Sequence, residues 1–204
     1  MSTYADLIED IRMEVADEAE SRWSDAQMLR ALAWSVRRLA HVLRRNDIEP
    51  GRSITTITTV PGDDTYALPA DFMAPYGLYR DATKTSLEQQ SEASWAVKGN
   101  PGECSMWLKR GANALIAGTP TTAEALTLVY WPLPNTSGLL ATDAAPWSGA
   151  FNDILTQYAA LRLKNIDEMD ASMDVQLLQD IENNLIATYG QNNPMTVSRR
   201  GWLI

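Results

Sequence analysis

The chain has 204 residues, which suits one domain, or one domain with an inserted module, and allows a sizeable core. Its 26 Asp and Glu residues outnumber 17 Lys and Arg residues, and the net charge of −9 disfavours a conventional DNA-binding domain, because an acidic surface repels phosphates. Cys104 is the only cysteine, which excludes an internal disulfide and a zinc site built from cysteines. The chain start is amphipathic and acidic, and long apolar runs are missing, so neither a signal peptide nor a membrane span is expected.

Two amphipathic helices are predicted in the first part of the chain. Apolar residues recur at helical spacing over residues 3–20, with acidic residues between them. Ser24 and Gln27 have the spacing of a capping box, and the apolar stripe after them predicts a second helix over residues 25–45. The arginine pairs 37–38 and 44–45 on this helix would either touch phosphate or, as is commoner, form a solvated face or salt bridges.

A β-rich segment follows these helices. Residues 53–60 consist of Ser, Thr, Ile and Val and so favour a strand, and a turn then leads to a second strand at residues 65–68. Pro69 has no N–H, so it is expected to end this strand at a tight corner. The structural residues assigned to the corner are Tyr66, Leu68, Pro69, Asp71 and Phe72.

Alternating side chains predict more strands at residues 104–109, 114–117 and 126–131. Pro132 ends the last of them. Because the connecting loops are short, we predict five or six strands that are mostly antiparallel.

Helical spacing returns over residues 149–166 and 171–189, with Gly190 placed as the C-cap of the last helix. The sequence therefore predicts an α+β fold, in which a four-helix bundle has an antiparallel β module inserted between its second and third main helices. The predicted parts are a bundle of residues 1–50 and 146–190, a module of residues 51–145 and a C-terminal tail of residues 191–204. Buried bundle positions are expected at Leu32, Val36, Ile154, Tyr158, Leu178 and Ile181.

Residues that carry catalytic or metal chemistry are scarce. His41 is the only histidine, and no triad or histidine-rich metal site is recognisable around it. Cys104 has no histidine near it in sequence and is expected to be a buried, inert thiol. The acidic cluster from Asp167 to Asp174 lacks the ligand spacing of a calcium loop. We therefore expect no catalytic residue, no metal site and no cofactor, and a protein that is not an enzyme.

The tryptophans leave two interpretations open. Trp95, Trp107, Trp131 and Trp147 would either line a site for a sugar or another ligand or pack in the core and at subunit contacts, which is their usual role. The first interpretation gives the alternative function, a tail-associated binding module with an aromatic ligand or surface site on the β module. It requires these tryptophans to be exposed.

Three local patterns carry a family resemblance. Arg22-Trp23-Ser24-Asp25 opens a helix whose stripe ends in Arg37-Arg38, and the corner pattern runs from Tyr66 to Phe72. The third pattern, residues 128–134, is followed after Asp143 by a helix rich in Tyr and Ala. In order and spacing, these patterns resemble the head–tail adaptor (connector, or head-completion) proteins of tailed bacteriophages and prophages.

The resemblance implies a structural protein of the virion neck that is made in the host cytoplasm. Such adaptors form rings, typically twelvefold, beneath the portal, where they extend the DNA channel and receive the next neck or tail protein. The implied partners are other copies of the chain, the phage portal protein, that neck or tail protein, and double-stranded DNA that passes without sequence recognition; no membrane is involved. The acids of the first helix and of residues 150–189 are candidates for a channel wall that offers phosphates no partner.

The last ten residues combine two cations with large apolar side chains. Arg and Trp are residue types that anchor interfaces, the first by bidentate hydrogen bonds and the second by apolar area. The hypothesis is that this tail docks on a neighbouring subunit or on the portal. Its docking residues are Arg199, Arg200, Trp202, Leu203 and Ile204.

Overall fold

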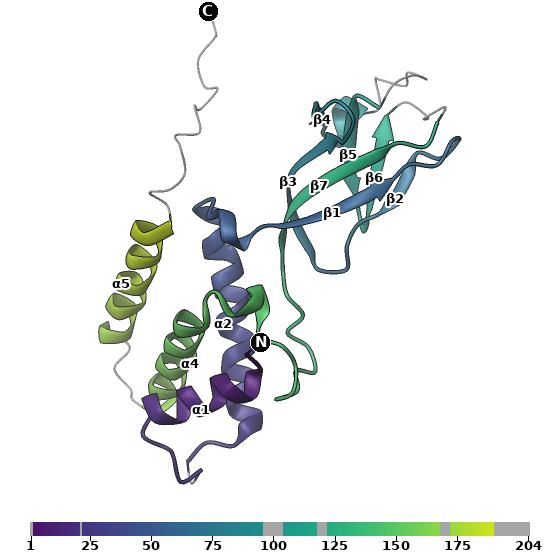
Figure 1. Cartoon of the computed structure of the whole chain (residues 1–204). Helices are drawn as coiled ribbons and strands as arrows, with labels where there is room; N and C mark the ends of the chain where they lie inside the picture. Colours follow the sequence, from purple (N-terminus) through teal and green to yellow (C-terminus); the bar gives the residue numbers. More distant parts are fainter. Residues whose placement is uncertain (1, 21, 96–103, 118–121, 168–171, 190–204) are drawn as a thin grey trace, which may run out of the picture. The chain divides into compact units, whose positions relative to one another are not determined.

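The computed structural model describes residues 2–20, 22–95, 104–117, 122–167 and 172–189 (Figure 1). It divides into two compact units. The helical unit comprises Met1–Gly51 and Pro134–Ile204, and the β unit comprises Arg52–Leu133.

Helix α1 (Tyr4–Glu14) opens the helical unit. A capping box between Thr3 and Asp6 begins it, and its buried face packs against α2 and α4. The prediction of a helix over residues 3–20 is too long, because the chain leaves the helix after Glu14 and Ala16 has a φ of 54°. This left-handed conformation is unfavourable for a residue with a Cβ and does not continue a right-handed helix.

Helix α2 (Asp25–Arg45) has 21 residues and begins with the predicted capping box of Ser24 and Gln27. Its apolar stripe is buried and includes Leu32, Val36 and Leu39, each with no exposed surface. A short 3-10 turn, η1 (Glu49–Gly51), follows and ends the first segment of the helical unit.

The segment after Leu133 returns to the helical unit. Residue Thr3 forms an antiparallel bridge with Ala144, and the backbone N–H of Tyr4 donates to the carbonyl of Asp143 at 3.0 Å. A 3-10 turn, η2 (Pro146–Gly149), then leads into α4. These bonds attach the start of the chain to the segment that precedes its third long helix.

Helices α4 (Asn152–Asp167) and α5 (Ser172–Tyr189) complete the helical unit. Tyr158 of α4 is fully buried, whereas Ile154 is half-buried. Over residues 176–189 of α5, whose side chains the structure describes, Leu185 is the one buried residue. The burial expected for Leu32, Val36 and Tyr158 is confirmed, and that expected for Ile154, Leu178 and Ile181 is wrong, because these three side chains are only half-buried.

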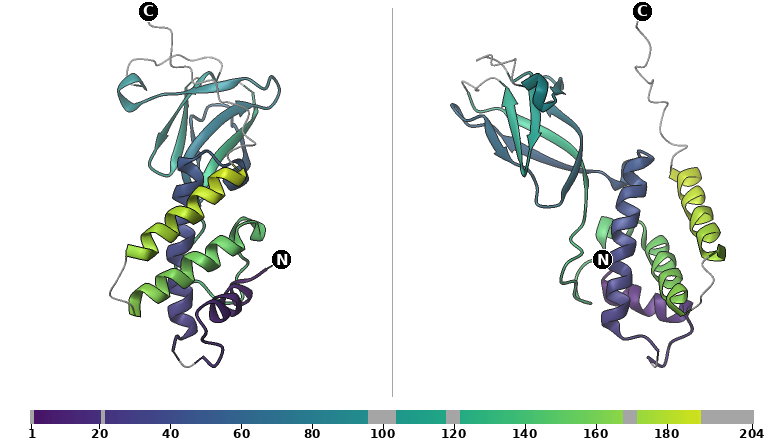
Figure 2. Two further views of the ribbon diagram at one scale, coloured as in Figure 1. Left: turned by 90° about the vertical axis from the view of Figure 1, so that its left-hand side faces the viewer. Right: turned by 180° about the vertical axis from the view of Figure 1, so that it is seen from behind.

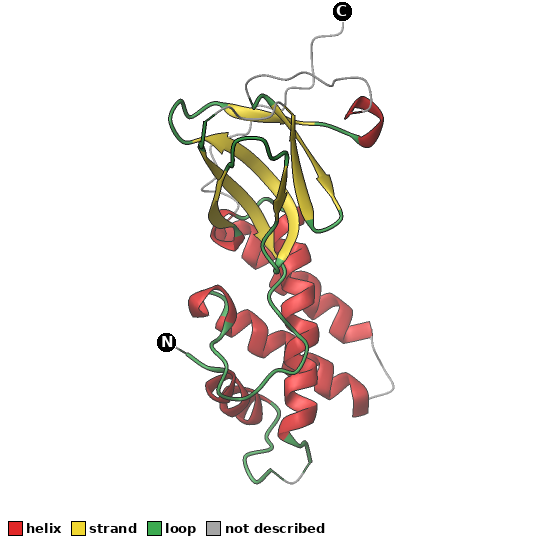
Figure 3. Ribbon diagram, turned by 90° about the vertical axis from the view of Figure 1, so that its right-hand side faces the viewer, coloured by secondary structure: helices red, strands yellow, loops and turns green. Residues whose placement is uncertain are grey.

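The β unit is a seven-stranded sheet with the order β1-β7-β3-β4-β5-β6-β2. Its strands curl into a nearly closed barrel (Figure 3). The short helix α3 (Glu92–Trp95) lies between β4 and β5 in sequence. The strands are β1 (Ser53–Thr58), β2 (Thr65–Ala67), β3 (Phe72–Arg80), β4 (Ser86–Gln89), β5 (Met106–Arg110), β6 (Asn113–Ala117) and β7 (Ala125–Pro132).

The two edge strands of this sheet, β1 and β2, are joined by the turn over residues 59–64. The hydroxyl of Tyr66 in β2 accepts a hydrogen bond from the backbone N–H of Val60 at 3.1 Å and lies 2.8 Å from the carbonyl of Asp63, to which it donates. A side chain therefore links the edge strand β2 to the end of the edge strand β1. Inside, the barrel is filled by a cluster that includes Leu78, Trp107, Leu126 and Leu128.

The prediction of a four-helix bundle with an inserted antiparallel β module is wrong, although the α+β class is right. The sheet is a seven-stranded, nearly closed barrel, and its β4–β5 pair is parallel, with Glu88 opposite Met106. Helices α5, α4 and α1 lie at successive positions along the length of α2, so the four helices do not run alongside one another as in a bundle (Figure 2). The physical reasons are that α1 is only 11 residues long and that α5 buries little of its surface over residues 176–189, where its side chains are described.

Candidate functional site

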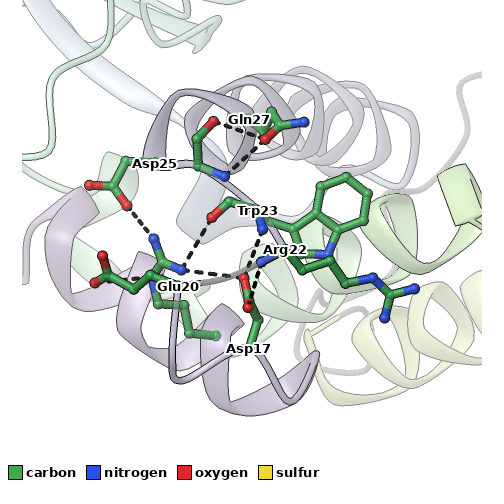
Figure 4. A network of polar contacts seen from close by, with 8 residues as sticks. Asp17, Glu20, Arg22, Trp23, Asp25 and Gln27 are labelled. Atoms are coloured by element: carbon green, nitrogen blue, oxygen red, sulfur yellow. Dashed lines mark hydrogen bonds and ion pairs between the residues drawn. The ribbon is translucent and has the colours of Figure 1, made fainter.

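The turn between α1 and α2 contains a network of buried charges (Figure 4). The guanidinium of Arg12 lies 3.4 Å from Asp17, donates to the carbonyl of Trp23 at 3.3 Å and contacts Asp25 at 2.5 Å. Arg12 and Asp17 are only 6% and 3% exposed. Burial of an ionised side chain costs free energy unless the charge is paired and hydrogen-bonded, and these contacts pair the charge of Arg12.

Asp17 also binds backbone N–H groups of the Arg22-Trp23-Ser24-Asp25 segment, the first of the three sequence patterns. Its two carboxylate oxygens accept hydrogen bonds from the N–H groups of Arg22 and Trp23 at 3.0 and 2.9 Å. Trp23 is buried, and Ser24 caps α2 together with Gln27 (Figure 4). The Arg22-Trp23-Ser24-Asp25 segment therefore has a structural role, because it fixes the turn that connects α1 to α2.

Sequence reasoning missed Arg12 and Asp17. The available signal was an arginine next to Ile11 on the apolar side of an otherwise acidic helix. Such a cation is exposed or paired, and the sequence does not say which of the nearby acids pairs with it.

The corner residues assigned from the sequence lie in β2, at the start of β3 and in the segment between them. Tyr66 and Leu68 are buried, and the N–H of Phe72 donates to the carbonyl of Pro69 at 3.0 Å. The Asp71 carboxylate accepts a hydrogen bond from the hydroxyl of Tyr130 at 3.0 Å, and the rings of Phe72 and Tyr130 stack with centroids 5.6 Å apart. Burial and Asp71 raise the pKa of Tyr130 to about 12.

The third sequence pattern lies on β7 and is also packed. Tyr130 and Trp131 are 5% and 4% exposed. The guanidinium of Arg52 lies 3.7 Å from the ring centroid of Tyr76 and 5.3 Å from that of Trp131, within the range of cation–π attraction. Trp107 is 1% exposed, so neither Trp107 nor Trp131 is available to an outside ligand.

A cavity of about 570 Å³ lies between α2 and α5. Its lining includes Arg38, His41 and Arg45 from α2 and Glu182 from α5. The side chains of Arg38 and Glu182 form an ion pair at 2.5 Å, and the hydroxyl of Tyr158 donates to Glu182 at 3.3 Å. These two contacts join α5 to α2 and α4.

The described part of the chain holds no group of three or more His, Cys, Asp or Glu residues that is able to bind a metal ion. Cys104 is buried, and burial and the nearby Glu124 raise the pKa of its thiol. His41 lines the α2–α5 cavity beside two arginines. The docking residues assigned to the C-terminal tail, Arg199, Arg200, Trp202, Leu203 and Ile204, lie outside the described residues.

Comparison with known proteins places these patterns in a family. None of the described helices is long and apolar enough to cross a membrane. No curated protein matches the sequence. The model of the SU10 adaptor protein family matches residues 2–199, which is nearly the whole chain. The chain therefore belongs to the SU10 adaptor protein family and is a phage head–tail adaptor.

Proposed function

We propose that copies of this chain form a ring in the virion neck that joins the portal to the tail and extends the DNA channel. The observation that carries the proposal is the family match over residues 2–199. The net charge of −9 agrees with it, because an acidic ring offers passing phosphates few partners and lets the duplex slide without sequence recognition. In this role the protein acts by position and contact, not by catalysis.

The partners of the ring are the portal on one side and the next neck or tail protein on the other. The C-terminal tail is the proposed attachment to the portal or to a neighbouring subunit. Arg199 and Arg200 would meet an acidic surface, while Trp202, Leu203 and Ile204 would enter an apolar groove. A segment of this kind orders when it binds.

The test is co-purification of the full chain with the portal protein of the same phage, followed by measurement of subunit stoichiometry. The expected result is a ring of copies on each portal, typically twelve. A chain that lacks residues 195–204 is expected to keep the thermal midpoint of the isolated protein and to lose attachment to its partner. If the truncated chain binds its partner with wild-type affinity, the docking site is to be sought on the β unit instead of the tail. Full-length protein that never binds the portal would contradict the proposed function.

The alternative of an aromatic binding module receives no support from the described tryptophans of the barrel. It requires exposed rings, but Trp107 and Trp131 are core residues and Trp95 of α3 is half-buried. It is therefore not proposed as a second function.

A further inference from the structure

One side of α2 is basic and faces solvent. Arg30, Arg37, His41 and Arg44 are all exposed and recur at spacings of seven, four and three residues, which places them on one side of a helix. With a rise of about 1.5 Å per residue, this row is about 21 Å long. We call it the basic face. Arg37 donates a hydrogen bond to the hydroxyl of Thr136 at 3.3 Å, but no residue of the row forms an ion pair with another described residue.

Arg38, which lies beside this row, shows the contrast. It is ion-paired with Glu182 and its guanidinium lies 5.6 Å from the ring centroids of Trp34 and Tyr158. The helical unit thus pairs Arg38 with an acid of its own, whereas Arg30, Arg37 and Arg44 form no ion pair with a described residue.

The outer side of α1 has the opposite charge. Glu9, Asp10 and Glu14 are exposed and form no ion pair with a described residue. Met13 lies among them and is 61% exposed, which is unusual for a large apolar side chain. The one cation of the helix, Arg12, is buried in its own network and does not neutralise this side. We call Glu9, Asp10, Met13 and Glu14 the acidic face.

We propose that the acidic face of α1 docks on the basic face of α2 of a second copy of this chain. The charges are complementary, and no residue of either face forms an ion pair within the described part of its own chain. A contact between two different surfaces is heterologous, so it propagates from copy to copy and produces a closed ring when the rotation between copies allows. The inference rests on the proposed ring and names the surface through which its subunits meet.

Because exposed charges make the proposed contact, its strength depends on the salt concentration. Exposed ion pairs are individually weak and are screened by salt, with a Debye length of about 8 Å at physiological ionic strength. Association of free chains is therefore expected to be weak and to fall as salt rises. Binding to a portal would bring copies together at high effective concentration, which strengthens weak contacts without changing them.

Charge reversal on each face tests the inference. The variant Arg37→Glu/Arg44→Glu makes the basic face acidic, and Glu9→Arg/Asp10→Arg makes the acidic face basic. Each double variant alone is expected to weaken self-association at least tenfold and to reduce the number of copies per portal, because like charges then meet. A chain that carries all four substitutions restores opposite charges and is expected to recover association. Glu88→Arg, an exposed reversal on β4, is the control and is expected to behave as wild type.

The thermal midpoint and circular dichroism of each variant establish that it is folded, which is expected because all four reversed side chains are exposed. Double variants that associate as tightly as wild type would overturn the inference. So would an Arg37→Glu/Arg44→Glu chain that loses weak binding to duplex DNA while its self-association is unchanged, since the basic face would then serve phosphates.

A cross-linking experiment separates this inference from the proposed function. Chains with Met13→Cys and chains with His41→Cys are mixed at high concentration and treated with a short bismaleimide; the native Cys104 is buried. The mixture is expected to give cross-linked dimers, and each variant alone is not. If wild-type protein fails to bind the portal but the mixture cross-links, the proposed function fails and the interface stands. If wild-type protein forms rings on the portal but no mixed dimer appears, the interface fails alone.

Discussion

The guanidinium of Arg12 and the carboxylate of Asp17 lie 3.4 Å apart, and their side chains are only 8% and 2% exposed. The pair closes the turn from α1 to α2, and Asp17 also accepts the N–H groups of Arg22 and Trp23. A buried ion pair of this kind adds little net stability over an apolar pair, yet removal of one partner leaves the other charge buried and unpaired.

The variant Arg12→Met is therefore expected to lower the free energy of unfolding by about 3–5 kcal/mol. Chemical denaturation monitored by tryptophan fluorescence measures this loss, and the buried Trp23 makes the signal sensitive to the turn. Arg110→Ala is the matched control, because the Arg110–Glu92 pair is exposed on both sides. It is expected to leave the denaturation midpoint unchanged. Equal effects of the two substitutions would contradict a special role for the Arg12 network.

Tyr66→Phe tests the side-chain link between β1 and β2. The substitution keeps the buried ring but removes the hydroxyl that contacts Val60 and Asp63. Loss of these bonds is expected to cost about 1–3 kcal/mol and to speed hydrogen exchange at the Val60 amide. Tyr76→Phe, at a tyrosine that is 42% exposed, serves as the control. Unchanged exchange at Val60 would mean that the link does not depend on the hydroxyl.

Three buried tyrosines predict loss of stability at alkaline pH. Burial raises the pKa of Tyr4 and of Tyr130 to about 12, and it raises the pKa of Tyr158 further above its ordinary value of 10. Because the unfolded chain ionises its tyrosines near pH 10 and the folded chain resists ionisation, the stabilisation is complete below pH 10 and is lost as the pH rises toward 12. The urea midpoint is expected to be flat up to about pH 10 and to fall above it. A Tyr130→Phe variant is expected to show a smaller decrease of the urea midpoint above pH 10. An identical decrease would show that Tyr130 does not contribute to this pH dependence.

Helix α5 provides a fourth prediction. Leu185 is 3% exposed, so Leu185→Ala is expected to cost about 2–5 kcal/mol of stability. Ile181 is half-buried, and Ile181→Ala is expected to cost clearly less, since fewer of its contacts are lost. Thermal or chemical denaturation compares the two directly. A larger loss for Ile181→Ala would show that Ile181, not Leu185, is the main buried side chain of α5.

Much of the local structure was predictable because it depends on neighbours in sequence. The capping box of Ser24 and Gln27 and the long helix after it follow from side-chain spacing, and the strand after Arg52 follows from a run of β-branched residues. The three sequence patterns also indicated the adaptor family, which the family match confirms. In each case the informative residues lie within a few positions of one another.

Tertiary structure decided how these elements combine. Alternation in β5 predicts which side chains face inward, but the sequence predicted neither the strand β4 nor its parallel pairing, in which Glu88 lies opposite Met106. Helical spacing marked Ile181 and Leu178 as apolar positions, but their burial depends on how closely α5 approaches α2 and α4. The charge of Arg12 was visible in the sequence, whereas its burial required Asp17, Trp23 and Asp25 to converge after the chain had turned. Periodicity is a property of one segment, while sheet order, helix packing and the pairing of a buried charge are free-energy differences between alternative arrangements of many segments.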